Sequence, residues 1–503
     1  MKQTSKNLIT NIINLLSNIL IGLLYVPYLV NSLGVAAYGV LPLALIINQY
    51  VNVLTGALTG AITRFYSISL KQNDYNKASQ YLSTAFGVLL CFSLLFIPIV
   101  FFIIKNLDSL FNIPSELLNS GKILFFFTLI SFFISLFSSL FNVSLYAYNK
   151  LSTMNWIKIT RTVSKVLGVV IFFSLFRYDI KWVGIASFIA ELIVLGISIT
   201  LFYKYTQDKV SIKLKYIAKE HILVIFSMTS WILLHKFGDV FIYKIDNILV
   251  NRFWGTSISG VLGAVSELGG YMVTVIDVFA SLFGPIVLIT YAKGDIKRMV
   301  EIASNNSHLI CITASFICAF VIMFASPILT FWLGPNFAPY GDWLSLKIAC
   351  IPFISSSAIF AFVYRTYNKV KYPAIVALIC GLLNTGIMLI LFNHSHNTAI
   401  ISIALFIQWF IIYIQSYFYG TFYLQKIENR FSFISFTKIS SLCIVLMLIS
   451  YFIGKNYIHI NSFKELLGYG SLCGIILLTI YLLLLQKIGL FSSLRNVLKN
   501  IEE

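Results

Sequence analysis

Ionisable side chains interrupt an otherwise apolar stretch of the sequence, residues 222–250, at five positions. They are His235, Lys236, Asp239, Lys244 and Asp246. At about 100° per residue, these side chains fall within half of the circumference of one helix. A charged group in hydrocarbon costs about 2.5–3.5 kcal/mol, so such groups face a cavity or a partner. The pattern predicts a helix that lines a polar, water-filled cavity.

These groups also allow simpler interpretations. Lys236 and Asp239 are three residues apart on the predicted helix and can form a purely structural ion pair. Lys244 and Asp246 could lie near the outer end of the helix and reach water. Several ionisable groups on one helix are a large cost for bracing alone, which favours the cavity.

Other apolar runs, or their ends, carry further candidates. The cations are Arg64, Lys158, Arg161 and Lys165, and the carboxylates are Glu191, Glu267 and Asp277. Arg64, Lys158 and Arg161 could instead extend to the inner membrane surface, with only their aliphatic stems in hydrocarbon. Glu191 could tie two helices together rather than contact a substrate.

The elements that must position these groups are membrane helices. Hydrophobic residues make up 59% of the 503 residues and charged residues 11%, with a mean hydropathy of +0.89. Soluble chains carry about a quarter charged residues, so lipid must surround most of this chain. Run lengths and the lack of period-two alternation predict an all-α fold rather than a barrel. About fourteen runs could span a membrane, at 7–30, 39–61, 83–104, 123–145, 156–175, 182–203, 222–250, 260–289, 308–329, 344–364, 374–391, 399–422, 439–452 and 466–485.

The net charge of +18 follows the predicted topology. In a soluble protein it would suggest a nucleic-acid partner. With a cytoplasmic N-terminus and alternating loops, however, about 25 of the 36 Lys and Arg residues fall in inner loops and about 8 in outer ones. This bias is the positive-inside rule, and it predicts that both termini are cytoplasmic. The first apolar run lacks a small-residue cleavage site, which favours a first span over a signal peptide.

Two segments of the sequence are repeated. Residues 33–41 resemble residues 254–262 at an offset of 221, and residues 147–150 resemble residues 366–369 at an offset of 219. A repeat of six helices keeps the same orientation in the membrane. The sequence therefore predicts two six-helix lobes, 1–208 and 209–430, related by an axis along the membrane normal, with a substrate route between them. Residues 431–503 form two additional helices.

Motifs of several enzyme classes are missing. The sequence has no GxxxxGK[ST], GxSxG, HExxH or CxxC pattern, and its seven cysteines are scattered through apolar runs. No predicted outer loop is long enough to build a catalytic domain. We therefore expect no enzymatic activity, no metal site and no bound cofactor.

Short motifs along nearly the whole chain resemble one transporter family. Leu33-Gly34 followed by Tyr38-Gly39 is similar to the LG-x-x-x-YG between the first two helices of polysaccharide flippases. Residues 245–249, leading to Trp254-Gly255, resemble the D-x-I-L signature of their seventh helix. Gly56, Gly60 and Arg64 resemble the end of their second helix, and Pro373 and Asn384 their helix 10–11 region. The chain resembles the polysaccharide transport branch of the multidrug/oligosaccharidyl-lipid/polysaccharide exporter superfamily, and in particular the O-antigen (Wzx-type) flippases.

The resemblance implies a substrate and roles for the charged groups. The substrate would be an oligosaccharide on undecaprenyl pyrophosphate, turned from the cytoplasmic to the outer leaflet of the bacterial inner membrane. Cations suit a pyrophosphate, and the candidates, in decreasing order, are Lys236, Lys244, Arg161, Lys165 and Arg64. Carboxylates would orient these cations or bind a coupling proton or sodium ion, and the candidates are Asp239, Asp246, Glu267, Asp277 and Glu191. Expected partners are the lipid-linked oligosaccharide, membrane lipid and a polysaccharide polymerase, with no nucleic acid.

Other functions fit parts of the pattern. A cation-coupled multidrug exporter of the same superfamily would favour a carboxylate-rich cavity, whereas the candidates in this chain are mixed, with a cationic bias in the N-terminal lobe. A lipid II flippase is a second transport alternative. A membrane polymerase or ligase would need a large external loop, and a scaffold would leave the charges of residues 222–250 without a role.

Overall fold

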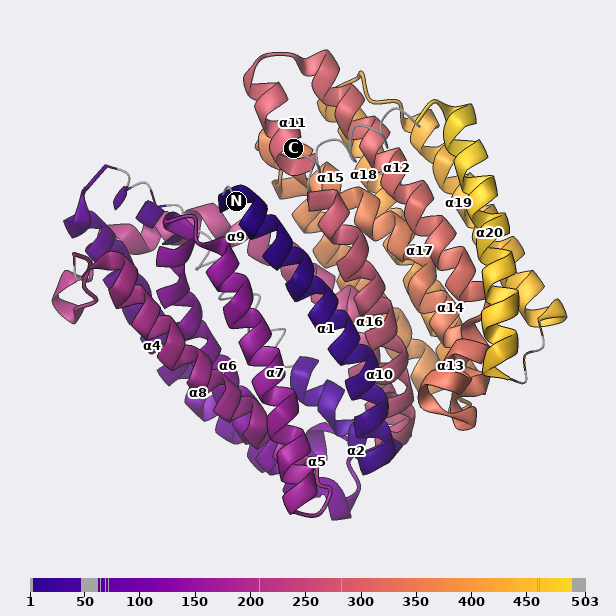
Figure 1. Ribbon diagram of the computed structural model, residues 1–503, viewed down its shortest axis with the longest axis horizontal. Coiled ribbons are helices and arrows are strands. Elements are labelled where there is room, and N and C mark those ends of the chain that lie inside the picture. The colour runs from indigo at the N-terminus through magenta and orange to yellow at the C-terminus, as the bar shows by residue number, and fades with distance from the viewer. Residues whose placement is uncertain are drawn as a thin grey trace. The chain divides into compact units, whose positions relative to one another are not determined.

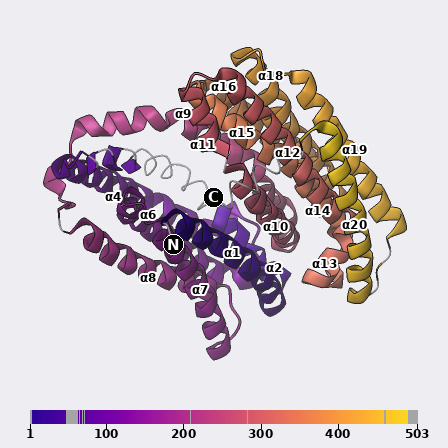
Figure 2. The ribbon, with the colours of Figure 1, turned by 45° about the horizontal axis from the view of Figure 1, so that its top comes forward.

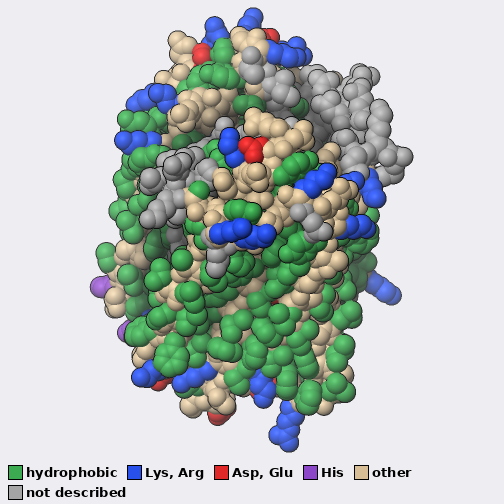
Figure 3. Space-filling model, turned by 90° about the vertical axis from the view of Figure 1, so that its left-hand side faces the viewer, with side chains coloured by type: hydrophobic (Ala, Val, Ile, Leu, Met, Phe, Trp, Pro, Cys, Tyr) green, Lys and Arg blue, Asp and Glu red, His purple; other side chains and the backbone are tan. Residues whose placement is uncertain are grey.

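The chain folds into helices, which the computed structural model in Figure 1 describes for residues 3–46, 62–207 and 209–490, except 64, 68, 71, 282, 459 and 461. Two compact units divide it, Met1–Gly260 and Val261–Glu503. No strand occurs among the described residues. Figure 3 shows one face of the molecule as a broad hydrophobic band, with most Lys and Arg side chains toward its two ends. This distribution suits a surface surrounded by lipid.

The first unit consists of long helices joined by short turns. Its main elements are α1 (Gln3–Leu33), α2 (Val35–Tyr38), α4 (Tyr75–Lys105), α5 (Leu107–Leu110), α6 (Ser115–Ala147), α7 (Leu151–Leu175), α8 (Lys181–Thr206), α9 (Lys219–Tyr243) and the first part of α10 (Ile245–Ser281). A short 3₁₀ turn, Leu214–Tyr216, precedes α9. Figure 2 shows α4, α6 and α8 side by side, and α6 packs against both of the others. Aliphatic side chains, leucine above all, and aromatic side chains fill this layer.

The second unit is arranged around α12 (Ile296–Met323), whose central stretch is largely buried. Helices α14, α15, α19 and α20 all contact α12 (Figure 2). The described elements are the rest of α10, α11 (Phe283–Ala292), α13 (Ala325–Leu333), η2 (Pro335–Tyr340), α14 (Gly341–Ala349), α15 (Ile351–Thr366), α16 (Lys371–His394), α17 (Ala399–Ile412), η3 (Tyr413–Phe418), α18 (Tyr419–Ile427), α19 (Phe433–Tyr457) and α20 (Phe463–Ile488).

Eleven helices of the described part of the chain are long and apolar enough to cross a membrane. The predicted second span is described only as far as residue 46. The fifth is α7, which has 25 residues but carries three cations. The seventh and eighth fall in one apolar stretch, Leu233–Ile276. The prediction of an all-α membrane protein is confirmed, and these three differences account for the larger predicted number of spans.

One predicted span is wrong in its extent. We expected an uninterrupted helix over residues 222–250, but α9 ends at Tyr243 and α10 begins at Ile245. Lys244 between them has a non-helical backbone, with φ −128°. A second break follows at Gly255, where φ is 78°. A backbone in that region of φ favours glycine, which has no Cβ to clash.

Loops that were predicted to share a membrane side meet one another within each unit. In the first unit, Asn7 at the start of α1 donates to the side chain of Asn149 in the α6–α7 turn at 3.1 Å. At the other end, Ser120 donates to Asp179 in the α7–α8 turn at 2.8 Å. These contacts agree with the predicted alternation of inner and outer loops.

In the second unit too, loops that were predicted to share a membrane side contact each other. Tyr367, after α15, donates to Glu428, after α18, at 3.2 Å. Burial, together with the Glu428 carboxylate, raises the pKa of Tyr367 to about 12. Across the unit, Lys455 at the end of α19 lies 3.3 Å from Asp342 at the start of α14. Predicted inner loops therefore contact inner loops, and outer contact outer.

The internal repeat is present in the backbone as well as in the sequence. Gly34 and Gly255 both have a positive φ, 81° and 78°. Asn149 and Asn368 occupy the left-handed region with φ of 55° and 54°. The numbers within each pair differ by the same offset as the corresponding sequence repeat. Asparagine and glycine are the residues that tolerate this conformation, so these backbone positions explain why the two motifs look alike.

The helix starts of the two copies match too. Asp74 caps α4 by accepting a hydrogen bond from the backbone N–H of Lys77 at 2.9 Å, and Asp295 caps α12 by accepting one from Arg298 at 3.0 Å. The two aspartates occupy equivalent positions of the repeat. An N-cap side chain satisfies a backbone donor that the helix itself leaves free. The repeat therefore preserves the local chemistry that starts each helix.

The boundary between the compact units lies beyond the predicted lobe boundary at residue 208. Residues 209–260 pack on the first unit, where the backbone N–H groups of Ser211 and Ala218 donate to Ser79 and Thr84, both at 3.1 Å. At the other end of this segment, Arg252 donates to the carbonyl of Ser109 at 2.7 Å. Residues 209–260 thus pack with the first compact unit, although in the sequence repeat they begin the second copy. The predicted lobes at 1–208 and 209–430 describe the repeat, and they remain a prediction.

Candidate functional site

The first group of charged side chains lies on α9. Nζ of Lys236 is 2.9 Å from Oδ2 of Asp239, and Nδ1 of His235 is 3.4 Å from the same oxygen. The spacing of three and four residues brings these side chains together on one face of the helix. The Asp239 side chain is mostly buried, whereas Lys236 is 57% exposed. Lys236 therefore keeps hydrogen-bonding capacity for an anion while Asp239 holds it in place.

The break after α9 separates the remaining members of the predicted cluster from this group. Lys244 lies in the break and is half-buried. Asp246 follows in the first turn of α10 and is only 3% exposed, so it does not reach water as one interpretation suggested. Asn247 and Asn251 beside it are also buried. Asn251 accepts a hydrogen bond from the backbone of Asn112 at 3.1 Å, which ties this polar segment to the start of α6.

The second group joins α7 to α8. Nε of Arg161 lies 2.8 Å from Oε1 of Glu191, and the Glu191 side chain is 12% exposed. Lys165 lies one turn further along α7 and Lys158 one turn before, on the same side of the helix as Arg161. This ion pair connects α7 to α8, and a role of Glu191 in a site remains a prediction. The group has three cations for one carboxylate, so it keeps a positive excess.

Helix α1 adds two polar residues that we did not single out from the sequence. Thr162 of α7 donates to Oδ1 of Asn18 at 2.9 Å, and Asn18 donates to Asn14 at 3.1 Å. Asn14 and Asn18 are four residues apart in an apolar run, and that spacing on a membrane helix is the signal that could have identified them. Uncharged amides do not stand out in a pattern of ionisable residues.

Three predicted site residues remain. Glu267 lies on the part of α10 that belongs to the second unit and is half-buried. The side chain of Asp277, on the same helix, lies outside the described residues, as does Arg64. Among the described residues, no group of three His, Cys, Asp or Glu side chains could hold a metal ion. The charged groups on α7, α8 and α9 suit the binding of an anion or the transfer of an ion.

Residues 5–286 match the family of proteins described as "Polysaccharide biosynthesis protein". The match covers more than half of the 503 residues. The chain belongs to the polysaccharide biosynthesis protein family. One relative, the "Uncharacterized membrane protein EpsK" of Bacillus subtilis (strain 168), is 25% identical over 401 residues, which are 78% of this chain and 77% of EpsK. The predicted resemblance is confirmed at the level of the family.

Solved structures show the fold that this family member shares. The lipid II flippase MurJ, in an inward closed conformation, matches with a TM-score of 0.70 at 18% identity, over 96% of this chain and 99% of MurJ. An inward-facing multidrug resistance MATE family transporter of the MOP superfamily matches with a TM-score of 0.65 at 14% identity, over 85% of this chain and 99% of that one. The polysaccharide biosynthesis family member is therefore a multi-pass membrane protein with the fold of these transporters.

Proposed function

We propose that this protein is a flippase that moves an oligosaccharide linked to undecaprenyl pyrophosphate from the cytoplasmic to the outer leaflet of the bacterial inner membrane. The observation that carries the proposal is the match to the polysaccharide biosynthesis family over residues 5–286, in a chain made of membrane helices. A polysaccharide pathway that is assembled on a lipid needs a protein to turn its product across the bilayer. The shared fold with a lipid II flippase supports the same class of movement.

The charges of the first unit suit such a substrate. Its pyrophosphate and sugars cannot cross hydrocarbon without a polar path, whereas its polyprenyl tail can remain in lipid. The α7–α8 group offers three cations beside the single carboxylate of Glu191, and Lys236 on α9 is exposed. Cations in a partly desolvated setting bind phosphate oxygens through charge-assisted hydrogen bonds. We infer that these two groups contact the pyrophosphate, with Asp239, Asp246, Glu267, Asp277 and Glu191 as candidates for orienting cations or binding a coupling ion.

The predicted six-helix repeat suggests how the protein would move its substrate across the membrane. Two copies of a six-helix unit with the same orientation can rock against each other and expose a polar path to one side of the membrane at a time. An inward-negative potential favours the export of an anion by about 2.3 kcal/mol per charge and 100 mV. The coupling ion, if one is used, would be a proton or a sodium ion.

The location is part of the same proposal. The bias of Lys and Arg toward one set of loops supports a cytoplasmic location for both termini. Cysteine labelling tests this. In a chain without its seven native cysteines, Lys293→Cys should react with a membrane-impermeant thiol reagent only in inverted vesicles, and Lys455→Cys only in intact cells. The reverse pattern would invert the topology. A polysaccharide polymerase on the outer side is the expected partner.

The decisive experiment is deletion of the gene followed by analysis of lipid-linked sugars. We expect single repeat units to accumulate on the cytoplasmic leaflet and surface polysaccharide to disappear, with recovery from a plasmid copy. An unchanged surface glycan would refute the proposal. Two further arms separate the alternatives: restored growth on depletion of the cell's own lipid II flippase would identify a lipid II flippase, and increased drug resistance in a sensitive strain would identify a multidrug exporter.

A further inference from the structure

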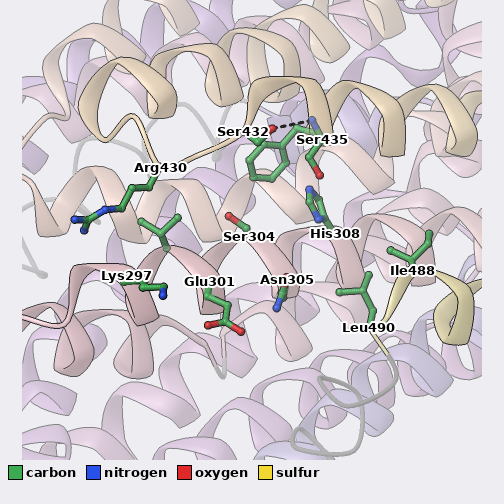
Figure 4. Close-up of a pocket in the computed structure, with 12 residues that line it drawn as sticks. Lys297, Glu301, Ser304, Asn305, His308, Arg430, Ser432, Ser435, Ile488 and Leu490 are labelled. Carbon is green, nitrogen blue, oxygen red and sulfur yellow. Dashed lines mark hydrogen bonds between the residues drawn. The ribbon is translucent and has the colours of Figure 1, made fainter.

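A cavity of about 700 Å³ opens at one end of α12 in the second unit. Its walls come from α12, from the segment before α19 with the first turns of that helix, and from the end of α20 (Figure 4). This end of the unit carries Lys297 and Arg430, which belong to predicted inner loops. The cavity therefore lies where the helices of this unit meet the membrane surface, and it shares no residue with the charged groups of the first unit.

One face of α12 supplies polar groups from the mouth of the cavity to its floor. Lys297, Glu301, Ser304 and His308 follow one another at intervals of four, three and four residues, which places them on the same side of a helix. Lys297 and Glu301 are exposed, Ser304 is half-buried and His308 is only 6% exposed. Polar side chains thus continue along this face of α12 from exposed positions to a buried one.

The opposite wall adds a third charge and the start of a helix. Arg430 is 54% exposed and lies 3.8 Å from Glu428, its one ion-pair partner among the described residues. Ser432 caps α19, accepting a hydrogen bond from the backbone N–H of Ser435 at 3.3 Å. Figure 4 shows Arg430, Ser432 and Ser435 across the space from Lys297, Glu301 and Asn305. The start of a 25-residue helix carries a partial positive charge, which favours an anion near Ser435.

His308 forms the floor and lacks a partner for one ring nitrogen. Its Nε2 is buried and makes no hydrogen bond with the described residues, although its ring packs edge-on against Phe436 with centroids 4.5 Å apart. Buried polar atoms are normally satisfied, so a free nitrogen at the floor of a polar cavity points to a ligand that supplies the missing group. The nitrogen can bond either a hydroxyl or a phosphate oxygen, depending on its protonation.

We propose that this cavity binds the headgroup of a membrane phospholipid that carries one phosphodiester and free hydroxyls, of the phosphatidylglycerol type. The phosphate lies between Lys297 and Arg430, and the hydroxyls reach Ser304 and Nε2 of His308. Two cations and the carboxylate of Glu301 leave one net positive charge, which matches a monoanion. The apolar residues Ile488 and Leu490 complete the rim, and the lipid-exposed side chains of α20 beyond them can accompany acyl chains. This apolar rim favours a lipid over a soluble phosphate ester.

The test is a titration of the full-length protein in detergent, with lipid binding followed by native mass spectrometry. Phosphatidylglycerol should bind at least tenfold more tightly than phosphatidylcholine. The double variant Lys297→Gln/Arg430→Gln should lose that tenfold preference. Its matched control, Lys293→Gln/Lys438→Gln, removes two exposed cations from the same end of the unit but outside the cavity, and should change binding less than twofold. Equal losses in the two variants would show nonspecific attraction and overturn the proposal.

A second set of measurements tests the depth of the site and the source of the phosphate. His308→Phe keeps a ring against Phe436 but removes Nε2, so it should weaken phosphatidylglycerol severalfold while leaving phosphatidic acid, which has no headgroup hydroxyls, unchanged. Glycerol 3-phosphate should compete only weakly, because it lacks acyl chains. Competition by glycerol 3-phosphate as strong as that of the lipid would overturn the lipid assignment. These measurements involve no transport, so their outcome is independent of the flippase proposal.

Discussion

Gly39 and Gly260 lie against each other in the first unit, although they belong to different copies of the sequence repeat. A Cβ built on either glycine would lie 3.0 Å from the other's Cα. The contact is reciprocal, because a Cβ on Gly260 would lie 2.5 Å from the carbonyl oxygen of Val35, and one on Gly39 would meet the carbonyl of Thr256. Val35 and Thr256 are themselves equivalent positions of the repeat. Equivalent residues of the two copies thus exchange contacts, as they do at a twofold axis.

This close approach makes Gly260 sensitive to a single added methyl group. We expect Gly260→Ala to destabilise the protein by about 1–3 kcal/mol, because the backbone must shift to relieve the contact with Val35. Gly270→Ala, further along α10, is the control, since no atom of the described residues lies within 4 Å of its Cβ. It should be neutral or slightly stabilising. Thermal unfolding in one detergent compares them, and equal melting temperatures would contradict the close contact.

The repeat predicts which residue can replace Gly294. This glycine has a φ of 77°, and its counterpart Asn73 has a φ of 58°. A Cβ added at Gly294 meets none of the described residues, so backbone strain is what should distinguish one substitution from another. Gly294→Asn should cost less than about 0.5 kcal/mol, whereas Gly294→Val should cost about 1–2 kcal/mol, because a β-branched residue resists a left-handed backbone. Similar unfolding free energies for the two variants would argue against equivalent turns.

The Arg161–Glu191 pair can be measured by a double-mutant cycle. Each single change to Ala leaves a partly buried charge without its partner, and the double change removes both. We expect a coupling energy of about 1 kcal/mol from unfolding measurements, reduced from that of a fully buried pair by the exposure of Arg161. A coupling near zero would mean that this ion pair does not join α7 to α8 in the membrane.

Charge reversal at Lys236 tests its place in the polar path. Lys236→Glu sets a second carboxylate beside Asp239 and should reduce export of the lipid-linked sugar at least tenfold, whereas Lys236→Arg should retain most of it. Lys455→Glu is a matched control, since this lysine is also 57% exposed and also pairs with an aspartate, Asp342. It should export normally. The comparison requires equal amounts of all three variants in the membrane. Full export by Lys236→Glu would show that α9 does not line the polar path.

The composition of the chain was sufficient to predict an all-α membrane protein, because apolar runs of span length have one stable solution in lipid. The alternation of its loops and its repeat could also be read from the sequence. Charge bias acts locally at each loop, and the left-handed turns at Asn149 and Asn368 require particular residue types. These features depend on a few neighbouring residues, and they agree with the structure.

Other features depend on distant residues and were settled only by the tertiary structure. The helix over residues 222–250 was predicted to be continuous, because no proline or glycine marks the break at Lys244. Sequence spacing could not predict the ion pair between Glu191 and Arg161, since the two residues lie on different helices. The cavity at His308 needed α12, α19 and α20 to come together. The sequence by itself determined which segments are apolar enough for lipid and how the chain alternates, because transfer to lipid is a property of each segment. Packing between segments decided which charges are paired and which buried polar atoms lack a partner among the described residues.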